Sequence, residues 1–454
     1  MSMGRGIRGR TRLTRRLLSF VAVAAIGTGC GSGAVPATTA SAPASQPATA
    51  GSSSPAPSSG EVACGGAQVT LTEWYHQYGE EGTREAALRY AEEFTKANPN
   101  VQVKVEWVPG DYFQKVRAAL LTESGPDIFE TTLADPALVA AGSMADLSDI
   151  FTPDVRAQFD PRSFTAYTID NKVYGLPFII DVVGLIYYRK SMLDAAGLSV
   201  PKTWEEFGAA AKKLTSGSAK GVFFGNDGGI SQAYTLVHAA GGEMVKDDKT
   251  VAYNTPEAAA AIATLAAMNQ DGSVLLGSPT EWYDPTALIN GFSAMQFGGL
   301  WMMPAVKKAL GDDFVIGPVP ASGATGKGAV ALSQWGAAVN GKSKNIACAK
   351  EYITWKWLKN DEIQKDFNLS YGFHLPPRLA LQKSADALQS GAPADAVKIL
   401  ADNGFVDSVY FSGAVSTPFQ DAVARIVKEG KDAAAELANA VTVSQKELDA
   451  LRGN

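Results

Sequence analysis

An unusual density of aromatic and polar side chains lies at residues 73–78, which read Glu-Trp-Tyr-His-Gln-Tyr. A polar pair, Glu130 and Thr131, follows the short apolar run at 127–129. Aromatic rings offer flat apolar faces and the polar groups offer hydrogen bonds, which together suit the binding of a small polar molecule. Ligands of open α/β sheets gather beyond the carboxyl ends of the strands. We therefore expect both segments to face one binding site.

Motifs of catalysis are missing from the sequence. It contains neither a Gly-x-Ser-x-Gly elbow nor a His-Glu-x-x-His motif. Residues 321–328 resemble a phosphate-binding loop, but Ala321 replaces its first Gly and Gly328 replaces its Ser or Thr, so we interpret them as a flexible loop. The three histidines are scattered at 76, 238 and 374, without metal-ligand spacing. We expect a protein that is not an enzyme and holds no metal or cofactor.

Strands and helices alternate around the two candidate segments. Strands have apolar residues with a period of two, and helices have them at i, i+3, i+4 and i+7. By these patterns we predict strands at 69–74, 101–107 and 127–129, with helices at 83–98 and 112–124. This order predicts an α/β lobe over a mostly parallel sheet.

A second run of elements begins after residue 183. Thr203 and Glu206 form a capping box, and Thr255-Pro256 has the pattern of a helix start. We predict strands at 184–188, 314–316 and 330–339, helices from 203 and at 255–269, and a mainly helical C-terminal third. A chain of 454 residues is too long for one compact domain, so two lobes are expected.

The N-terminal segment has the pattern of an export signal. Six arginines without an acid precede an apolar run at 17–26, which is too short to span a membrane. We predict a signal peptide at 1–29, which directs export of the protein by the general or the twin-arginine route. Gly27-Thr28-Gly29-Cys30 resembles a bacterial lipobox, although Gly27 departs from its usual Leu, Val or Ile. We expect a lipid on Cys30; the alternative is a plain cleaved signal with an incidental Cys.

Residues 30–63 contain Ala, Ser, Pro, Thr and Gly in such excess that we predict a disordered tether. Removal of residues 1–29, with their six arginines, leaves 34 basic against 46 acidic residues, a formal charge of −12. This charge disfavours nucleic acid and other polyanions, and membrane attachment would come through the lipid. Cys64 and Cys348 are expected to form a disulfide in an oxidising compartment, with two independent thiols as the alternative.

Four blocks of the sequence resemble extracellular solute-binding proteins of bacterial ABC importers, in the carbohydrate-type, maltose-binding-protein-like group. Each block is loose alone, but together they span nearly all of residues 65–454 in the family's order. Their most characteristic runs are Val69-Thr-Leu-Thr-Glu-Trp74, Val173-Tyr-Gly-Leu-Pro177, Gly298-Gly-Leu-Trp301 and Trp335-Gly-Ala-Ala-Val339.

The resemblance implies a periplasmic-binding-protein-like α/β fold, with two lobes joined by a multi-strand hinge and a ligand cleft between them. Its tracing puts lobe 1 at 64–177 plus 332–371, lobe 2 at 183–331 plus 378–454, and hinge crossings at 178–182 and 372–377. Cys64 and Cys348 then share a lobe, which supports their disulfide.

The resemblance also implies a function outside the cytoplasm. A monomer anchored to the cell membrane would capture a carbohydrate or sugar-like solute by lobe closure and deliver it to the transmembrane subunits of an ABC permease. The alternatives are a solute-sensing lipoprotein without a transport role and a secreted glycoside hydrolase that uses two carboxylates.

Seven side chains are expected to bind the solute. Asp181 lies in an apolar hinge run, where an unpaired carboxylate would be costly. The full set is Trp74, His76, Glu130, Asp181, Trp301, Trp335 and Tyr371. The alternatives are core packing for each Trp, a bond from Asp181 to a hinge amide, and a plain surface position for His76. We interpret Trp107, Trp204 and either Trp355 or Trp357 as core, and leave Trp282 and Tyr283 undecided.

Overall fold

The computed structural model describes residue 64, residues 66–122 and residues 125–452. The predicted signal peptide, Cys30 and the tether up to residue 63 lie outside these residues. The strands are β1 (Val69–His76), β2 (Val101–Val108), β3 (Ile128–Thr131), β4 (Thr168–Ile169), β5 (Lys172–Val173), β6 (Leu176–Arg189), β7 (Lys220–Phe223), β8 (Ser293–Gly299), β9 (Phe314–Pro318), β10 (Val330–Val339) and β11 (Gly404–Phe405).

Helices lie between the strands and fill most of the C-terminal third. The α-helices are α1 (Thr83–Ala97), α2 (Tyr112–Leu120), α3 (Pro136–Ala140), α4 (Pro153–Arg156), α5 (Lys190–Ala195), α6 (Trp204–Leu214), α7 (Tyr234–Ala239), α8 (Pro256–Gln270), α9 (Thr286–Ile289), α10 (Met303–Leu310), α11 (Ile346–Trp357), α12 (Asp361–Leu369), α13 (Leu379–Ser384), α14 (Gly391–Asn403), α15 (Thr417–Glu429) and α16 (Ala433–Arg452). Short 3₁₀ helices occupy Ser148–Ile150, Pro161–Tyr167, Leu300–Met302, Asp386–Leu388 and Gly413–Val415.

The predicted capping signals start their helices as expected. Thr203 accepts a hydrogen bond from the Glu206 amide at 3.1 Å, and the Glu206 carboxylate accepts one from the Lys202 amide at 2.8 Å. Thr255 accepts from the Ala258 amide at 3.1 Å. These side chains satisfy amide donors that have no partner inside the first helical turn.

The main sheet has the strand order β2-β1-β3-β10-β6-β8-β7, with β11 beside β10 and β9 beside β6. The β1 strand runs parallel to β2 and β3, as predicted for a βαβ arrangement. The prediction of a mostly parallel sheet is wrong beyond β3, because β10 runs antiparallel to both β3 and β6, and β8 and β9 run antiparallel to β6. The sheet is therefore mixed.

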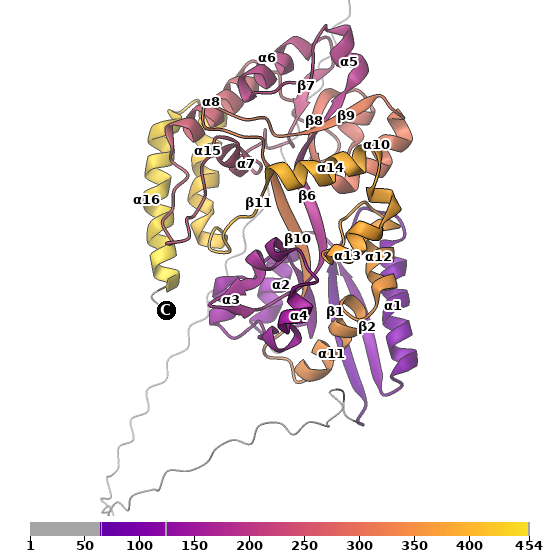
Figure 1. The fold of residues 1–454 in the computed structure, drawn as a ribbon. Helices are drawn as coiled ribbons and strands as arrows, with labels where there is room; N and C mark the ends of the chain where they lie inside the picture. The colour runs from indigo at the N-terminus through magenta and orange to yellow at the C-terminus, as the bar shows by residue number, and fades with distance from the viewer. Residues whose placement is uncertain (1–63, 65, 123–124, 453–454) are drawn as a thin grey trace, which may run out of the picture. The chain divides into compact units, whose positions relative to one another are not determined.

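Two strands join the halves of the molecule. The β6 and β10 strands lie side by side and pair antiparallel from Leu176↔Ala337 to Val183↔Ala331, with one register shift between Trp335 and Gly336 (Figure 1). Ile179 and Ala337 belong to the hydrophobic core that also holds α1, whereas Val183 and Ala331 belong to the core that holds α6 and α8. The fold is thus two α/β lobes joined by crossing strands, and the lobe limits given above stay predictions.

Three predicted boundaries differ from the structure in ways that affect the candidate site. Tyr75 and His76 complete β1 beyond the predicted end at residue 74, and Glu130 and Thr131 complete β3 beyond residue 129, so these residues end strands where loops were expected. The α2 helix stops at Leu120, four residues early. The β6 strand is a single run of 14 residues, where only 184–188 was predicted. Its unbroken apolar character hides its period, because nearly every residue is buried.

The predicted disulfide between Cys64 and Cys348 is present, with the Cα atoms 4.3 Å apart. It links the residues before β1 to α11, across 284 positions of sequence. Both cysteines are buried in the core of the first lobe, which also contains α1. The start of the folded chain is therefore covalently tied to the lobe that carries β1 and β3.

Candidate functional site

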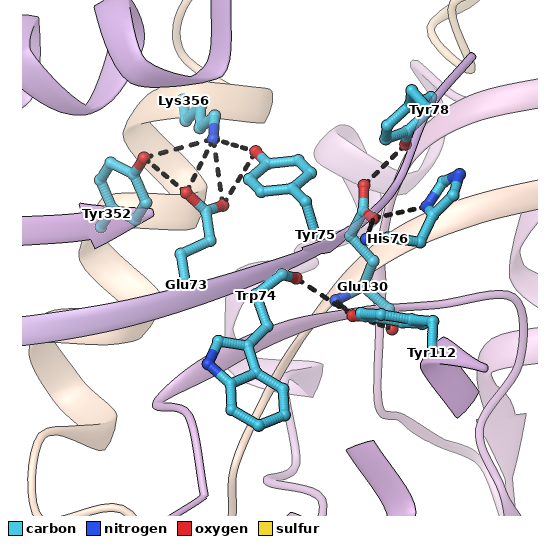
Figure 2. Close-up of polar contacts among 9 residues, drawn as sticks. All are labelled: Glu73, Trp74, Tyr75, His76, Tyr78, Tyr112, Glu130, Tyr352 and Lys356. Carbon is cyan, nitrogen blue, oxygen red and sulfur yellow. Dashed lines mark hydrogen bonds and ion pairs between the residues drawn. The ribbon is translucent and has the colours of Figure 1, made fainter. Parts of the chain in front are cut away.

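Glu130 collects three hydrogen bonds at the end of β3. Its carboxylate accepts from the His76 amide at 2.9 Å and from the Tyr78 hydroxyl at 2.6 Å, and lies 2.8 Å from the His76 Nδ1 (Figure 2). The side chain is 3% exposed, whereas that of His76 is 19% exposed. The two sequence segments chosen for their polar and aromatic residues therefore meet, as parallel neighbouring strands require.

Tyr112, at the start of α2, forms hydrogen bonds with the backbone of both Glu130 and Trp74. Its hydroxyl accepts from the Glu130 amide at 2.8 Å and lies 3.0 Å from the carbonyl oxygens of both Glu130 and Trp74 (Figure 2). Burial, and then the charge of Glu130, raises the pKa of Tyr112 well above its usual value, so the phenol stays protonated and can donate. The ends of β1 and β3 are consequently held together by a side chain.

Aromatic rings cover the exposed side of His76. The Trp335 ring of β10 stacks on the imidazole with centroids 3.9 Å apart and planes at 12°. Phe113 lies parallel to Trp335 at 5.6 Å and is 47% exposed. The Tyr78 ring lies 3.9 Å from the His76 ring at 40°. His76, Tyr78 and Trp335 are only partly exposed, so Phe113 is the most exposed ring of the group.

The alternative that Asp181 bonds to a hinge amide is wrong, because its partner is a histidine side chain. Asp181 lies 2.5 Å from Nδ1 of His374, a residue of the segment between α12 and α13. The other ring nitrogen of His374 lies 3.7 Å from Glu80, in the loop after β1. Burial opposes the charged imidazole, but Asp181 and Glu80 outweigh it and raise the pKa of His374 to about 10.

The Tyr78 hydroxyl bonds to Glu130 and is also influenced by the charges of Glu80 and Asp181. Burial raises its pKa well above the usual value, and the charges of Glu130, Glu80 and Asp181 raise it further. The phenol is therefore a neutral donor to Glu130 across the physiological range. We refer to Glu130, His76, Tyr78, Trp335 and Phe113 as the first-lobe cluster.

Three of the predicted binding residues share no side-chain hydrogen bond or ring contact with this cluster, although Trp74 packs against the same group of core residues as Trp335. Trp74 directs its indole to the face of β1 opposite Glu73, and only its carbonyl contacts the Tyr112 hydroxyl (Figure 2). The hydroxyl of Tyr371 bonds to Arg89 and Asp366, both at 3.2 Å. Neither side chain is shown in contact with Glu130.

Trp301, the third, belongs to an aromatic group of the second lobe. Its indole N–H donates to the Tyr283 carbonyl at 2.9 Å, and its ring meets Trp282 edge-on at 5.7 Å and 70°. Tyr283 itself is 57% exposed. The two aromatics left undecided from sequence are thus neighbours of Trp301 and form a second patch of ring surface.

A second carboxylate network occupies the opposite face of β1. Glu73 lies 3.0 Å from Lys356 Nζ through both of its oxygens, and accepts hydrogen bonds from Tyr75 at 3.0 Å and Tyr352 at 2.9 Å (Figure 2). Lys356 is fully buried, and burial lowers its pKa despite the opposing effect of Glu73. Every group that faces Glu73 belongs to the core of the first lobe, so this network is structural.

A cavity of about 540 Å³ lies elsewhere, and none of the seven predicted residues lines it. Its walls include His238, Asp407 and Tyr410 of the second lobe and Thr165 and Thr168 near β4. We favour the first-lobe cluster as the binding surface, because it combines aromatic faces with a buried carboxylate at the ends of parallel strands. The cavity has a mixed-charge lining that also includes a ring pair, His238 stacked on Phe405 with centroids 3.6 Å apart, beside Asp407.

Two features, a metal site and a membrane-spanning helix, are absent from the described residues. Within 64, 66–122 and 125–452, no group of three or more His, Cys, Asp or Glu side chains is arranged to hold a metal ion. Over the same residues, no helix is both long and apolar enough to cross a membrane.

Sequence reasoning missed several members of the site. Phe113 and Tyr112 were assigned only to a helix, although their place just after a strand was a usable signal. His374 and Glu80 carried no local signal, because their partner Asp181 lies 193 residues before His374. Tyr78 belonged to the segment first singled out.

Comparisons with known proteins agree with this architecture. The family model of bacterial extracellular solute-binding proteins matches residues 79–365. A maltotriose-binding protein of Pyrococcus abyssi is 24% identical over 327 residues, which cover 69% of this chain and 67% of that protein. A lactose-binding protein of Rhizobium radiobacter is 27% identical over 259 residues, or 53% and 58%. A probable ABC transporter-binding protein of Deinococcus radiodurans is 25% identical over 284 residues. The matches span about two thirds or less of these curated relatives.

Solved structures share the fold over most of the described chain. A solute-binding protein of Thermotoga lettingae, bound with α-D-tagatose, has a TM-score of 0.71 at 20% identity and covers 84% of this chain and 99% of its own. The GacH receptor of Streptomyces glaucescens has a TM-score of 0.68 at 23% identity, with the same coverage. At these identities the likeness concerns the fold. With the family model matching well over half of the sequence, the chain belongs to the bacterial extracellular solute-binding proteins of ABC transporters.

Proposed function

We propose that this protein binds a carbohydrate or sugar-like solute at the first-lobe cluster, closes its lobes over it and delivers it to an ABC permease. The observation that carries the proposal is the parallel arrangement of His76, Trp335 and half-exposed Phe113 beside the Glu130 carboxylate. A sugar has apolar C–H faces that pack on aromatic rings and hydroxyls that donate to carboxylates. The sugar ligands of the relatives named above support this choice of solute.

The second lobe would supply the opposing surface. Trp301, Trp282 and Tyr283 form its exposed aromatic patch, and closure would bring this patch over the solute. A closed form that contacts the solute from both sides binds it more tightly than an open form, and this difference drives closure. The protein would perform no bond cleavage.

Family membership implies a location outside the cytoplasm. We propose that residues 1–29 direct export and that a lipid on Cys30 then anchors the protein to the cell membrane as a monomer. Residues 31–63 would separate the solute-binding unit from the membrane surface, where the permease subunits lie. A lipid is needed because the chain after residue 29 has a formal charge of −12, which repels anionic membranes.

A thermal-shift screen tests the proposal. The purified protein would be heated with maltotriose, lactose, tagatose and a polyol panel, and in parallel with amino acids and peptides. A ligand that binds only the folded state raises the melting temperature. We expect a rise with at least one sugar or polyol, and no product of hydrolysis in the same mixtures. A response confined to amino acids or peptides would contradict the carbohydrate assignment.

A further inference from the structure

Three separate parts of the chain meet at the imidazole of His374. Asp181 comes from the crossing strand β6, Glu80 from the loop between β1 and α1, and His374 from the segment between α12 and α13. The side chains of His374 and Asp181 are each 6% exposed, and that of Glu80 is 16% exposed. Because both ring nitrogens face carboxylates, the imidazole is a doubly paired cation.

The backbone around His374 is fitted to this arrangement. Leu375 exchanges two hydrogen bonds with Ile180, each of 2.8 Å, so the segment continues the sheet next to Asp181. Gly372 leaves room for the ion pairs: a Cβ there would lie 2.9 Å from Glu80 Cγ and 3.0 Å from His374 Nε2. At Gly82, with φ +92°, a Cβ would strike the Tyr371 ring at 2.8 Å. The loop after β1 is thus packed closely on the 371–375 segment.

The same loop carries Tyr78, which donates to Glu130 at 2.6 Å. Glu80 lies two residues further along and is held by His374. Burial opposes ionisation of Glu80, but the imidazole of His374 beside it outweighs this effect and lowers the pKa of Glu80. The loop is therefore fixed at one point to the solute surface and at a second point to the crossing strand through His374.

We propose that His374 is a positioning residue of the solute site, which links the crossing strand β6 to the loop that presents Tyr78 to Glu130. It acts through Glu80 and Asp181 and needs no contact with the solute. The inference rests on the proposed function in assigning the Tyr78 loop to the solute site, but the link itself is a property of the ligand-free protein.

Amide hydrogen exchange of the ligand-free protein, read by mass spectrometry, tests the link. In His374→Gln we expect the hydrogen-bonded amides that flank the loop, His76 and Thr83, and those of His374 and Leu375 to exchange at least tenfold faster. Peptides of β2 and α11 should keep wild-type rates. His238→Gln is the matched control, since His238 also pairs with an aspartate, Asp407, at 2.7 Å. Wild-type exchange at the amides of both His76 and Thr83 in His374→Gln would overturn the proposal.

Glu80→Gln provides a second test if His374→Gln fails to fold. It removes one ion pair and leaves the pairing of Asp181 with His374. We expect faster exchange confined to the flanking amides of His76 and Thr83, and unchanged exchange at both would count against the link.

Nuclear magnetic resonance of the three histidines gives an independent readout of the two ion pairs. With ¹⁵N-labelled histidine, His374 should remain protonated at pH 8.5 in the wild type and should titrate at lower pH in Asp181→Asn. Titration of wild-type His374 near its ordinary value would overturn the doubly paired cation. None of these experiments uses a sugar. A rise in melting temperature with a sugar, together with unaltered exchange, would therefore refute only this link. Altered exchange without such a rise would refute only the proposed function.

Discussion

Two carboxylates of neighbouring strands, Glu73 and Glu130, are equally buried but lie in different surroundings (Figure 2). Their exposed fractions are 2% and 3%. Glu73 faces a fully buried lysine and two tyrosines of the core, and every partner is internal. Glu130 faces the partly exposed imidazole of His76. This imidazole stacks on Trp335, which in turn lies parallel to the exposed ring of Phe113. The comparison shows that a buried acid becomes a binding candidate when its partners, and not the acid itself, reach the surface.

The largest effect is expected from removing the cation of the closed network. Lys356→Met leaves Glu73 charged, buried and without a cation, which should lower the free energy of unfolding by about 3–5 kcal/mol. Urea denaturation measures this loss. The double variant Glu73→Leu with Lys356→Met should recover most of it, because a buried pair replaced by apolar groups costs little. A loss below about 1 kcal/mol in the single variant would show that the Glu73 network does not stabilise the core in the way that distinguishes it from the Glu130 network.

Glu130→Gln should instead act on binding. It removes the charge that accepts from Tyr78 and His76, and a hydrogen bond to a charged group is worth about 1.5–3 kcal/mol, so affinity for the sugar found in the screen should fall about tenfold or more. Titration calorimetry measures the affinity. Glu73→Gln is the matched control on the opposite face of β1 and should lower stability with affinity retained. Equal affinity losses in both variants would remove the distinction.

The ion pairs of His374 predict a pH dependence of stability. Its folded pKa of about 10 lies above its ordinary 6.5, so its contribution is full below pH 6.5 and declines until pH 10 is passed. Glu80, whose pKa is lowered, contributes above its ordinary range and loses that contribution in acid. The stability difference between wild type and His374→Gln should therefore be largest near pH 6 and shrink towards pH 10. Urea midpoints measured across this range provide the check, and a constant difference would contradict the assignment.

The smallest effect concerns ring contact. Phe113→Ala should cost about 0.5–1.5 kcal/mol of sugar binding, the usual value of an aromatic contact, with little change in melting temperature. Phe292→Ala is the matched control, because Phe292 is 41% exposed and lies outside the cluster. Calorimetry of both variants should show weaker binding only for Phe113→Ala. If both bind as the wild type does, the stack has no part in recognition.

Sequence patterns predicted most of the first lobe because its strands are half-buried and its helices amphipathic. The β1, β2 and β10 strands have the alternation or length that defines a strand. In the second lobe, the Thr203 and Thr255 caps were predictable because a cap acts locally. The β6 strand was underestimated, since a strand buried on both faces has no period to read. The α2 helix was overextended for lack of a stop signal.

The candidate site was predictable only where its residues are neighbours in sequence or end adjacent strands. His76 and Glu130 met because β1 and β3 pair. The partner of Asp181 could not be inferred, because the fold alone brings His374 to it across 193 positions. The same holds for Glu73 and Lys356, which are 283 positions apart.

The most direct test of the central claim is a crystal structure of the protein with the sugar identified by thermal shift. The account predicts a sugar ring within van der Waals distance of Phe113 or Tyr78, with a hydroxyl in hydrogen-bond range of the Glu130–His76 pair and aromatic contact from the Trp301 patch. A sugar seated instead in the cavity beside His238 and Asp407, with the first-lobe cluster left untouched, would contradict it.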